Sequence, residues 1–216
     1  VLSVILILLL IGYLDMWDNT MKTISMTFVA ATIAIIFGIP FGILMSKSNL
    51  MQRIMNPILD VMQTMPSFVY LIPVVMLLGI GKVPGLLAVV IYAIPPIIRL
   101  TNLGIRLVSK DVIEAANSYG ASNRQKLIFV QIPLAMPTIM AGINQTIMLA
   151  LSMVVIASMI GVKGLGMPVL QSIQNQYLAL GLMNGLAIVA LAIIFDRVSQ
   201  QYGKRLQRHR EGGHDA

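Results

Sequence analysis

Long apolar runs alternate with short polar segments along most of this 216-residue chain. An α-helix needs roughly 20 apolar residues to cross a bilayer, whereas membrane barrels use short alternating segments. The pattern therefore predicts an all-α polytopic membrane protein with about six spans. Residues 1–14 are too short to cross alone, so we expect them to end a helix that begins upstream of Val1. The expected spans are 1–14, 21–45, 64–79, 86–107, 134–160 and 179–195.

Proline and glycine positions within and between these runs predict local features of the spans. Pro66 and Pro73 interrupt the third run, so we expect a short surface helix and then a bent span that starts near residue 64. Gly38 and Gly42 lie four residues apart on one helix face, a spacing that permits close helix packing. Residues 161–177 contain a glycine-rich loop and an amphipathic stretch, which predict a re-entrant segment before the last span.

A polar hinge at residues 109–126 separates two of the apolar runs. We expect Ser109 to cap a first short helix and Gly120 to end it in the left-handed conformation. Ser122, with a glutamine three residues later, has the spacing of a capping box that starts a second helix. Pro133 marks the handover to the next span. A helix–glycine–helix elbow at a membrane surface is suited to docking, because its polar end groups need a partner or water.

Composition agrees with a membrane protein and bears on its orientation. The chain is 57% hydrophobic and 11% charged, with a mean hydropathy of +0.87, whereas soluble domains are roughly a quarter charged. If the hinge is cytoplasmic, twelve of the fifteen Lys and Arg residues fall in the cytoplasmic segments 46–59, 99–133 and 196–216. The net charge of +7 then follows from the positive-inside rule. We expect a cytoplasmic C-terminus and no nucleic-acid partner.

Residues that carry chemistry are scarce. The phosphate-binding pattern Gly-x-x-x-x-Gly-Lys-Ser/Thr does not occur, and the chain has no cysteine. His209 and His214 lie in the polar tail, where solvation is a simpler expectation than metal binding. We therefore expect no catalytic residue, no metal site and no cofactor in this chain.

Three charged residues lie within or beside the apolar runs, at Asp60, Arg99 and Asp196. We place them close to the cytoplasmic ends and expect interfacial or local pairing, such as Asp196 with Arg197. An ionisable group at mid-membrane is a functional signal by default. Without a carboxylate or cation at mid-membrane, the chain lacks the groups that a proton or sodium relay normally uses. The energy for transport must then come from outside the chain.

Aromatic residues in the proline-bent spans are candidates for a translocation path. Distorted backbone at membrane depth is tolerated only against protein or a wet cavity, and ring faces attract cations. Packing and interfacial anchoring are the competing explanation. The candidate path residues are Pro66, Phe68, Tyr70, Tyr92 and Ser152.

The hinge carries a motif that resembles a known family. Glu114-Ala115-Ala116 is followed by Gly120 and then by Val-Gln-Ile-Pro at residues 130–133. This order is similar to the EAA loop of ABC-importer permeases, with conservative changes in its final Ile-x-Leu-Pro part. In that family the loop forms coupling helices that sit in a groove of the ATP-binding subunit. The resemblance implies that four residues of the hinge couple the chain to an ATPase, namely Glu114, Ala115, Ala116 and Gly120. An ordinary interfacial loop is the alternative.

Longer stretches strengthen the resemblance. Residues 60–73, 79–85, 93–101 and 133–161 are similar to the permease of glycine betaine/proline ABC importers, and the similarity extends over 27–197. It implies the type I importer (MetI-like) permease fold in a bacterial cell membrane. It also implies a second permease copy, ATP-binding cassette subunits that hold ATP and Mg²⁺, and an extracytoplasmic binding protein for a quaternary-ammonium osmolyte.

The resulting domain organisation is simple. We expect the end of a span and an external turn at 1–20, a permease domain at 21–198 that contains the coupling loop 109–133, and a basic tail at 199–216. The receptor is expected to be separate. Choline, carnitine and ergothioneine permeases fit the same resemblance. A membrane scaffold that recruits a partner through the hinge and an ion-coupled carrier are the remaining alternatives.

Overall fold

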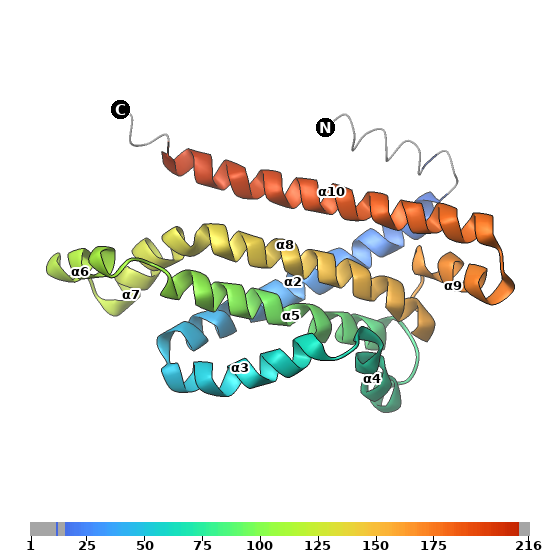
Figure 1. Cartoon of the computed structure of the whole chain (residues 1–216), viewed down its shortest axis with the longest axis horizontal. Coiled ribbons are helices and arrows are strands. Elements are labelled where there is room, and N and C mark those ends of the chain that lie inside the picture. The colour runs from blue at the N-terminus through green and yellow to red at the C-terminus, as the bar shows by residue number, and fades with distance from the viewer. Residues whose placement is uncertain (1–11, 13–15, 212–216) are drawn as a thin grey trace.

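The computed structural model describes residue 12 and residues 16–211, and it is a bundle of helices (Figure 1). The expected span at 1–14 lies outside the described residues apart from Gly12. The described helices are α2 (Trp17–Lys47), α3 (Asn49–Thr64), η1 (Ser67–Tyr70), α4 (Leu71–Leu78), α5 (Lys82–Arg106), α6 (Lys110–Ser118), α7 (Asn123–Gln125), η2 (Lys126–Gln131), α8 (Ile132–Ile156), η3 (Ala157–Ile160), α9 (Gly166–Asn175) and α10 (Leu178–Glu211).

Four helical segments in the described part are long and apolar enough to cross a membrane, and a bent pair raises the number to five. The four are Trp17–Lys47, Lys82–Arg106, Asn123–Ile160 and Leu178–Gln201. Figure 1 shows all four extending along the long axis of the bundle. The prediction of an all-α polytopic protein is confirmed.

The centre of the bundle is the close packing of α2 and α8 against α5. Glycine makes this approach possible, because a Cβ on Gly38 would collide with the Ile97 side chain. A Cβ on Gly42 would lie 2.6 Å from the Cβ of Thr101 and 2.7 Å from the carbonyl oxygen of Ile98. The predicted packing role of Gly38 and Gly42 is therefore confirmed.

The break in the third run lies where we expected it, because α3 ends at Thr64 and the next helical segment begins at Ser67. The segment before the break differs from the expected short surface helix, since α3 is a 16-residue helix that lies beside α5 (Figure 1). It is followed by a 111° bend, after which η1 and α4 point away. The cause is Pro66, which disfavours helical geometry in the residue before it. Met65 accordingly has φ −68° and ψ 134°.

The span after the hinge begins earlier than expected. α7, η2, α8 and η3 form one 38-residue helical segment, Asn123–Ile160, rather than a span from residue 134. Pro133 lies in the first turn of α8, directly after the π-helical turns of η2, so the change of winding precedes the proline and the chain does not break there. α10 likewise continues to Glu211, beyond the expected end of the span at residue 195.

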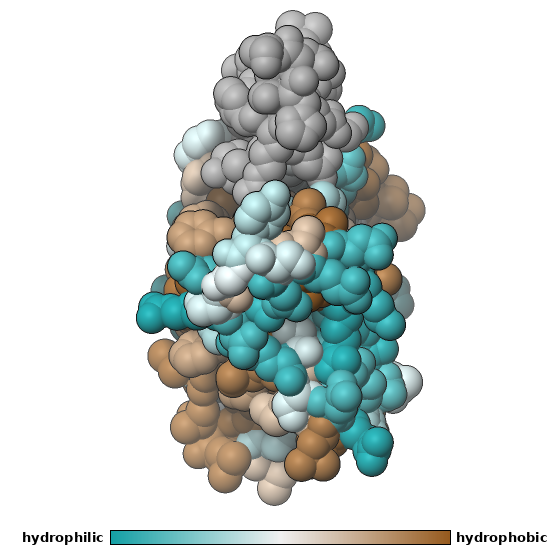
Figure 2. Space-filling view, turned by 90° about the vertical axis from the view of Figure 1, so that its left-hand side faces the viewer, coloured by the Kyte–Doolittle hydropathy of each residue, from teal (hydrophilic) through white to brown (hydrophobic). Residues whose placement is uncertain are grey.

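Basic segments gather at one end of the bundle. The α2–α3 turn, the end of α5, the α6–α7 hinge and the end of α10 lie at the left of Figure 1. The starts of α2 and α5 lie toward the opposite end, with α9. Figure 2 views the hinge end directly and shows hydrophilic residues across this face, with hydrophobic residues along the flanks. The polar and apolar surfaces are thus divided as a membrane boundary requires.

Candidate functional site

The first arm of the hinge is α6, and its N-terminus corrects one prediction. Ser109 occupies the N-cap position, but its side chain makes no capping hydrogen bond. Its hydroxyl instead lies 3.5 Å from the Asp111 carboxylate, to which it donates. A cap needs the hydroxyl oxygen as an acceptor for a backbone N–H two or three residues later. The nearby carboxylate competes for the hydroxyl, and α6 begins without the expected cap.

The end of α6 is built as predicted. Gly120 has φ +73°, in the left-handed region. Its N–H donates to the carbonyl of Asn117 at 2.9 Å, and the N–H of Ala121 donates to the carbonyl of Ala116 at 3.0 Å. These two bonds define a Schellman motif, which satisfies carbonyls at a helix end. The chain reverses direction here through its own backbone bonds.

The second arm begins with the predicted capping box. The Gln125 N–H donates to the Ser122 hydroxyl at 3.3 Å, and the Ser122 N–H donates to the Gln125 side chain at 2.8 Å. The Lys126 ammonium donates to the Asn117 amide oxygen at 2.6 Å and so joins the two arms across the glycine. The elbow is a defined local structure whose polar groups are largely satisfied within it.

Neither arm of the elbow has a buried residue. Glu114 and Ala115 are exposed, Ala116 is half-buried, and Tyr119 is 92% exposed. Helices of soluble and membrane proteins usually bury one apolar face. A short helix with none, small side chains at its centre and one carboxylate offers a low surface that another protein can approach closely.

The structure brings together two of the five path candidates. The rings of Tyr70 and Tyr92 meet edge to face with centroids 5.5 Å apart, and the Tyr70 hydroxyl donates to the carbonyl of Met62. Both tyrosines belong to the main core cluster. Pro66 and Phe68 are exposed at the bend, and Ser152 is exposed on α8. A role of these five in a path remains a prediction.

Each of the three charged candidates has a partner on another helix. Arg99 of α5 donates to Asp60 of α3 at 2.5 Å, across 39 residues of sequence. Asp196 accepts from the Asn144 amide of α8 at 3.0 Å and from Gln200, so the expected partner Arg197 is not its hydrogen-bond partner. Gln200 lies one turn further along α10, whereas the Asn144 and Arg99 contacts join different helices.

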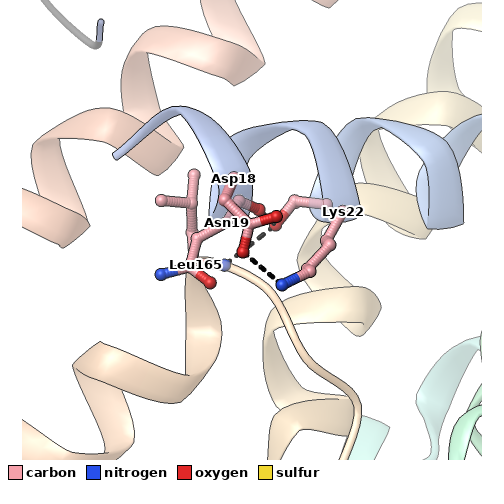
Figure 3. Close-up of polar contacts among 5 residues, drawn as sticks. Asp18, Asn19, Lys22 and Leu165 are labelled. Atoms are coloured by element: carbon pink, nitrogen blue, oxygen red, sulfur yellow. Dashed lines mark hydrogen bonds and ion pairs between the residues drawn. The ribbon is translucent and has the colours of Figure 1, made fainter. Parts of the chain in front are cut away.

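The opposite end of the bundle has a second organised site that sequence reasoning missed. The Thr23 hydroxyl donates to the carbonyl of Asn19 and accepts the buried N–H of Leu165, each at 2.9 Å. Figure 3 shows Leu165 against the first turns of α2, beside the Asp18–Lys22 ion pair. Thr23 and Leu165 are 142 residues apart, so no local pattern indicates the contact.

Glycines complete this second site. A Cβ on Gly164 would lie 2.5 Å from the Thr23 hydroxyl, and one on Gly166 would lie 2.6 Å from the carbonyl of Val155. A Cβ on Gly85 would collide with Val162. The loop at 161–166, which we call the far-end loop, is therefore held by α2, α5 and α8 together. Among the described residues no group of three or more His, Cys, Asp or Glu is placed to hold a metal.

Comparison with solved structures identifies the class of protein. The methionine ABC transporter MetNI in an inward-facing conformation matches with a TM-score of 0.79 at 19% identity, over 88% of this chain and 94% of the matched chain. An amino acid ABC transporter matches with a TM-score of 0.75 at 22% identity, over 92% and 97% of the two chains. Likeness at this identity establishes the fold, that of an ABC importer permease, as predicted.

The family follows from the sequence match. Residues 34–208 match the family described as the binding-protein-dependent transport system inner membrane component, and this chain belongs to that family. It is 54% identical to the glycine betaine/proline betaine transport system permease protein ProW of Escherichia coli, over 91% of this chain and 56% of that protein. It is 53% identical to the glycine betaine/carnitine transport permease protein GbuB of Listeria monocytogenes, over 92% of this chain and 70% of that protein. The chain thus spans little more than half the length of the first relative.

Proposed function

We propose that this chain is the membrane-spanning permease subunit of an ATP-driven importer for a quaternary-ammonium osmolyte, glycine betaine or proline betaine. The observation that carries the proposal is the exposed elbow at Gly120, which presents an unburied helix at one end of a bundle of spans. Permease relatives whose names specify glycine betaine transport support the substrate class.

The elbow is the proposed contact with a separate ATP-binding cassette subunit. Ala115 and Ala116 allow close approach, Glu114 supplies one charged anchor, and Gly120 fixes the angle between the arms. ATP and Mg²⁺ belong to that partner, and this chain takes part in no hydrolytic chemistry. A second copy of the permease and an extracytoplasmic binding protein complete the proposed assembly.

The elbow and the C-terminus are proposed to face the cytoplasm. Twelve of fifteen Lys and Arg residues lie in the segments assigned to the hinge end, and cytoplasmic segments are enriched in these residues. The three basic residues of the opposite end are Lys22, Lys82 and Lys163. The orientation places the far-end loop on the side from which a binding protein delivers solute.

Carnitine is the alternative substrate that a specific observation favours. The Listeria relative is named for glycine betaine and carnitine together, and it is nearly as similar to this chain as the Escherichia coli one. Carnitine shares the quaternary ammonium and the carboxylate of glycine betaine. Both solutes should therefore be measured in the same preparation.

The decisive experiment is uptake of glycine betaine into vesicles that contain this chain with its co-purifying partners, with and without internal ATP. We expect uptake only with ATP and binding protein, and no loss when ionophores collapse ion gradients at constant ATP. Uptake that collapses with the gradients would establish an ion-coupled carrier. Absence of a co-purifying Walker-motif subunit would favour a membrane scaffold.

Variants of the elbow test the coupling role in the same vesicles. Glu114→Ala and Gly120→Val should abolish ATP-dependent uptake while the chain still folds and inserts. Lys110→Ala, on the same helix but outside the motif, is the matched control and should retain uptake. Normal betaine uptake by Gly120→Val would contradict the coupling role. ATP-driven transport with no betaine or carnitine signal would keep the architecture and refute the substrate.

A further inference from the structure

Helix α3 has three distinct faces, and two of them match the surroundings expected of a helix at the edge of the bundle. An α-helix turns 100° per residue, so residues three and four apart share a face. The inner face packs against Met45 and Ile98. It consists of Met51, Met55, Leu59 and Met62. The second face is an exposed apolar stripe of Leu50, Ile54, Ile58 and Val61, which suits contact with lipid chains.

The third face is polar along its whole length, and we call it the polar face. None of its residues is buried in the single chain. It includes amides, a hydroxyl and both signs of charge. Its members are Gln52, Arg53, Asn56, Asp60, Gln63 and Thr64.

In the proposed topology the polar face lies at membrane depth, since α3 is the first half of a bent helix pair that is long and apolar enough to be one broken span. The 16 residues of α3 rise about 24 Å, most of a hydrocarbon layer of about 30 Å. Figure 1 shows α3 beginning at the hinge end and extending beside α5 toward the opposite end. Asp60 is the twelfth residue of α3, about 17 Å along it. The proposal therefore places Asp60 deeper than the cytoplasmic boundary at which we expected it from the sequence.

A polar face at this depth cannot be turned to lipid. Unsatisfied polar groups in hydrocarbon cost several kcal/mol each, and ionisable residues there face protein or a water-filled cavity. The neighbouring apolar stripe already supplies a lipid-facing side for α3. The polar face must therefore be turned toward water or toward another protein surface in the assembled membrane protein.

The centre of the polar face is the ion pair of Asp60 with Arg99. Both side chains remain open, at 61% and 38% of their surfaces, although the two groups are 2.5 Å apart. The Nε of Arg99 is buried and has no hydrogen-bond partner among the described residues. An ion pair this open adds little to the packing of two helices, because solvent screens the attraction. The Asp60–Arg99 pair is partly enclosed, and its groups can still form further hydrogen bonds.

We propose that the polar face of α3 lines the solute passage of the assembled transporter, and that the Asp60–Arg99 pair offers its two charges to a small zwitterion in transit. The inference rests on the function proposed above. A zwitterion carries a carboxylate for the guanidinium and a cationic group for the carboxylate. When the solute binds, the Asp60–Arg99 pair is replaced by two pairs, one between Arg99 and the solute carboxylate and one between Asp60 and the solute cation. Every charge then has a partner before and after binding, which lowers the free-energy cost of moving the solute through a region of low dielectric constant.

The absence of cysteine from the chain permits a direct test of whether this face is wet. Asn56→Cys and Gln63→Cys place thiols on the polar face, and Ile54→Cys and Ile58→Cys are matched controls on the apolar stripe. The full transporter in proteoliposomes is treated with a membrane-impermeant quaternary-ammonium methanethiosulfonate. A thiolate forms only in water, so we expect the polar-face thiols to react at least about tenfold faster than the controls.

The labelling pattern separates the possible surroundings of the polar face without any transport measurement. Slow reaction at all four positions would mean that protein covers the face, and it would overturn the proposal. Equal reaction at all four would place α3 outside the membrane and overturn it as well. Co-purification of the ATP-binding subunit with each variant checks that the assembly is intact.

The ion pair is tested by uptake with Asp60→Asn and Asp60→Glu. Loss of the carboxylate charge should lower glycine betaine uptake about tenfold or more, and the glutamate variant should restore part of it. In Asp60→Asn the thiol at position 63 should keep its labelling rate, because a structural collapse of α3 would change it. Unchanged uptake by Asp60→Asn would overturn the role of the pair.

The two proposals fail in distinguishable ways. If the wild-type vesicles show no betaine or carnitine uptake but the polar-face thiols label rapidly, the proposed substrate is wrong and the wet face stands. If betaine uptake is ATP-dependent but the polar-face thiols react no faster than the controls, the proposed function stands and the inference about α3 is wrong.

Discussion

The two ends of the bundle begin their chain reversals alike and complete them differently. A left-handed glycine with a Schellman pair of backbone bonds ends the helix at each end, at Gly120 and at Gly161 (φ +84°), where the N–H groups of Gly161 and Val162 donate to the carbonyls of Ser158 and Ala157. The elbow at Gly120 is held by hydrogen bonds among residues close in sequence, and a Cβ on Gly120 would meet no atom within 4 Å. Beyond Gly161 the far-end loop is also held by Thr23 of α2, which accepts the N–H of Leu165. A Cβ on Gly164 would lie 2.5 Å from the Thr23 hydroxyl, and one on Gly166 would lie 2.6 Å from the carbonyl oxygen of Val155.

The difference determines how strongly the shape of each end depends on the neighbouring helices. A reversal that needs no neighbour keeps its shape while its surface stays free, which suits a site covered by a different protein. A reversal that is wedged among three helices changes only when those helices move relative to one another. The elbow is therefore preorganised for the proposed contact with another protein, and the shape of the far-end loop depends on the packing of the three helices around it.

The largest effect should come from adding volume at Gly166. Gly166→Ala places a Cβ against the carbonyl of Val155 and the Ser158 hydroxyl, and overpacking costs about 1–3 kcal/mol. Gly185→Ala is the control, because nothing lies within 4 Å of the added Cβ. It should stabilise α10 by about 0.5–1 kcal/mol. Thermal unfolding in detergent measures both. Equal melting temperatures would refute the tight packing of the far-end loop.

Removal of the Thr23 hydroxyl should have the next largest effect. Thr23→Val keeps the shape but leaves the buried N–H of Leu165 without its acceptor, at a cost of about 1–3 kcal/mol. Thr23→Ser should retain most of the stability. Thr32→Val is a second control, because the Thr32 hydroxyl bonds only an exposed carbonyl within its own helix. A Thr23→Val protein as stable as wild type would show that the contact does not hold the loop.

A substitution at Gly120 should lower the stability of the protein less than the Gly166 and Thr23 substitutions do, but it should impair the coupling of ATP hydrolysis to uptake more. Gly120→Val must place a β-branched residue at φ +73°, and the left-handed conformation costs an L-residue about 1–2 kcal/mol. Gly120→Asn should be tolerated, since Asn adopts this conformation readily. The ratio of ATP hydrolysis to uptake is the measurement. Equal coupling ratios in the Val and Asn variants would argue that the angle of the elbow is unimportant.

The smallest effect distinguishes the two helix starts of the hinge. Ser122→Ala removes a capping bond that the structure contains and should cost about 1 kcal/mol. Ser109→Ala removes a side chain that caps nothing and should change little. Hydrogen exchange of the amides in α7 and α6 reports each helix separately. Faster exchange in α6 after Ser109→Ala would show that Ser109 caps in solution.

The hinge could be predicted from sequence because its causes are local. Gly120, Ser122 and Gln125 act on bonds within a few residues, and the spacing of Gly38 and Gly42 reports a helix face directly. The same reasoning failed at Ser109, where a neighbouring carboxylate competes for the hydroxyl. It placed the break near residue 64 correctly from Pro66, but it underestimated the preceding segment, which is a 16-residue helix beside α5 and not a short surface helix.

The rest of the site depends on contacts between distant parts of the chain. Thr23 with Leu165 and Asp60 with Arg99 are separated by 142 and 39 residues, and no periodicity or spacing in one segment indicates either pair. The polar face of α3 is present in the sequence at helical spacing. It becomes informative only when α3 is seen to be one continuous helix that lies beside α5.

The unbroken segment Asn123–Ile160 gives the molecule a lever arm. Its 38 residues form a rod about 57 Å long, with the elbow at one end and the far-end loop directly after the other. Rotation of such a rod by about 10° displaces one end relative to the other by about 10 Å, more than the spacing of a helix turn. A small tilt imposed at the hinge end would therefore become, without any relay of individual side-chain contacts, a large displacement at the opposite end.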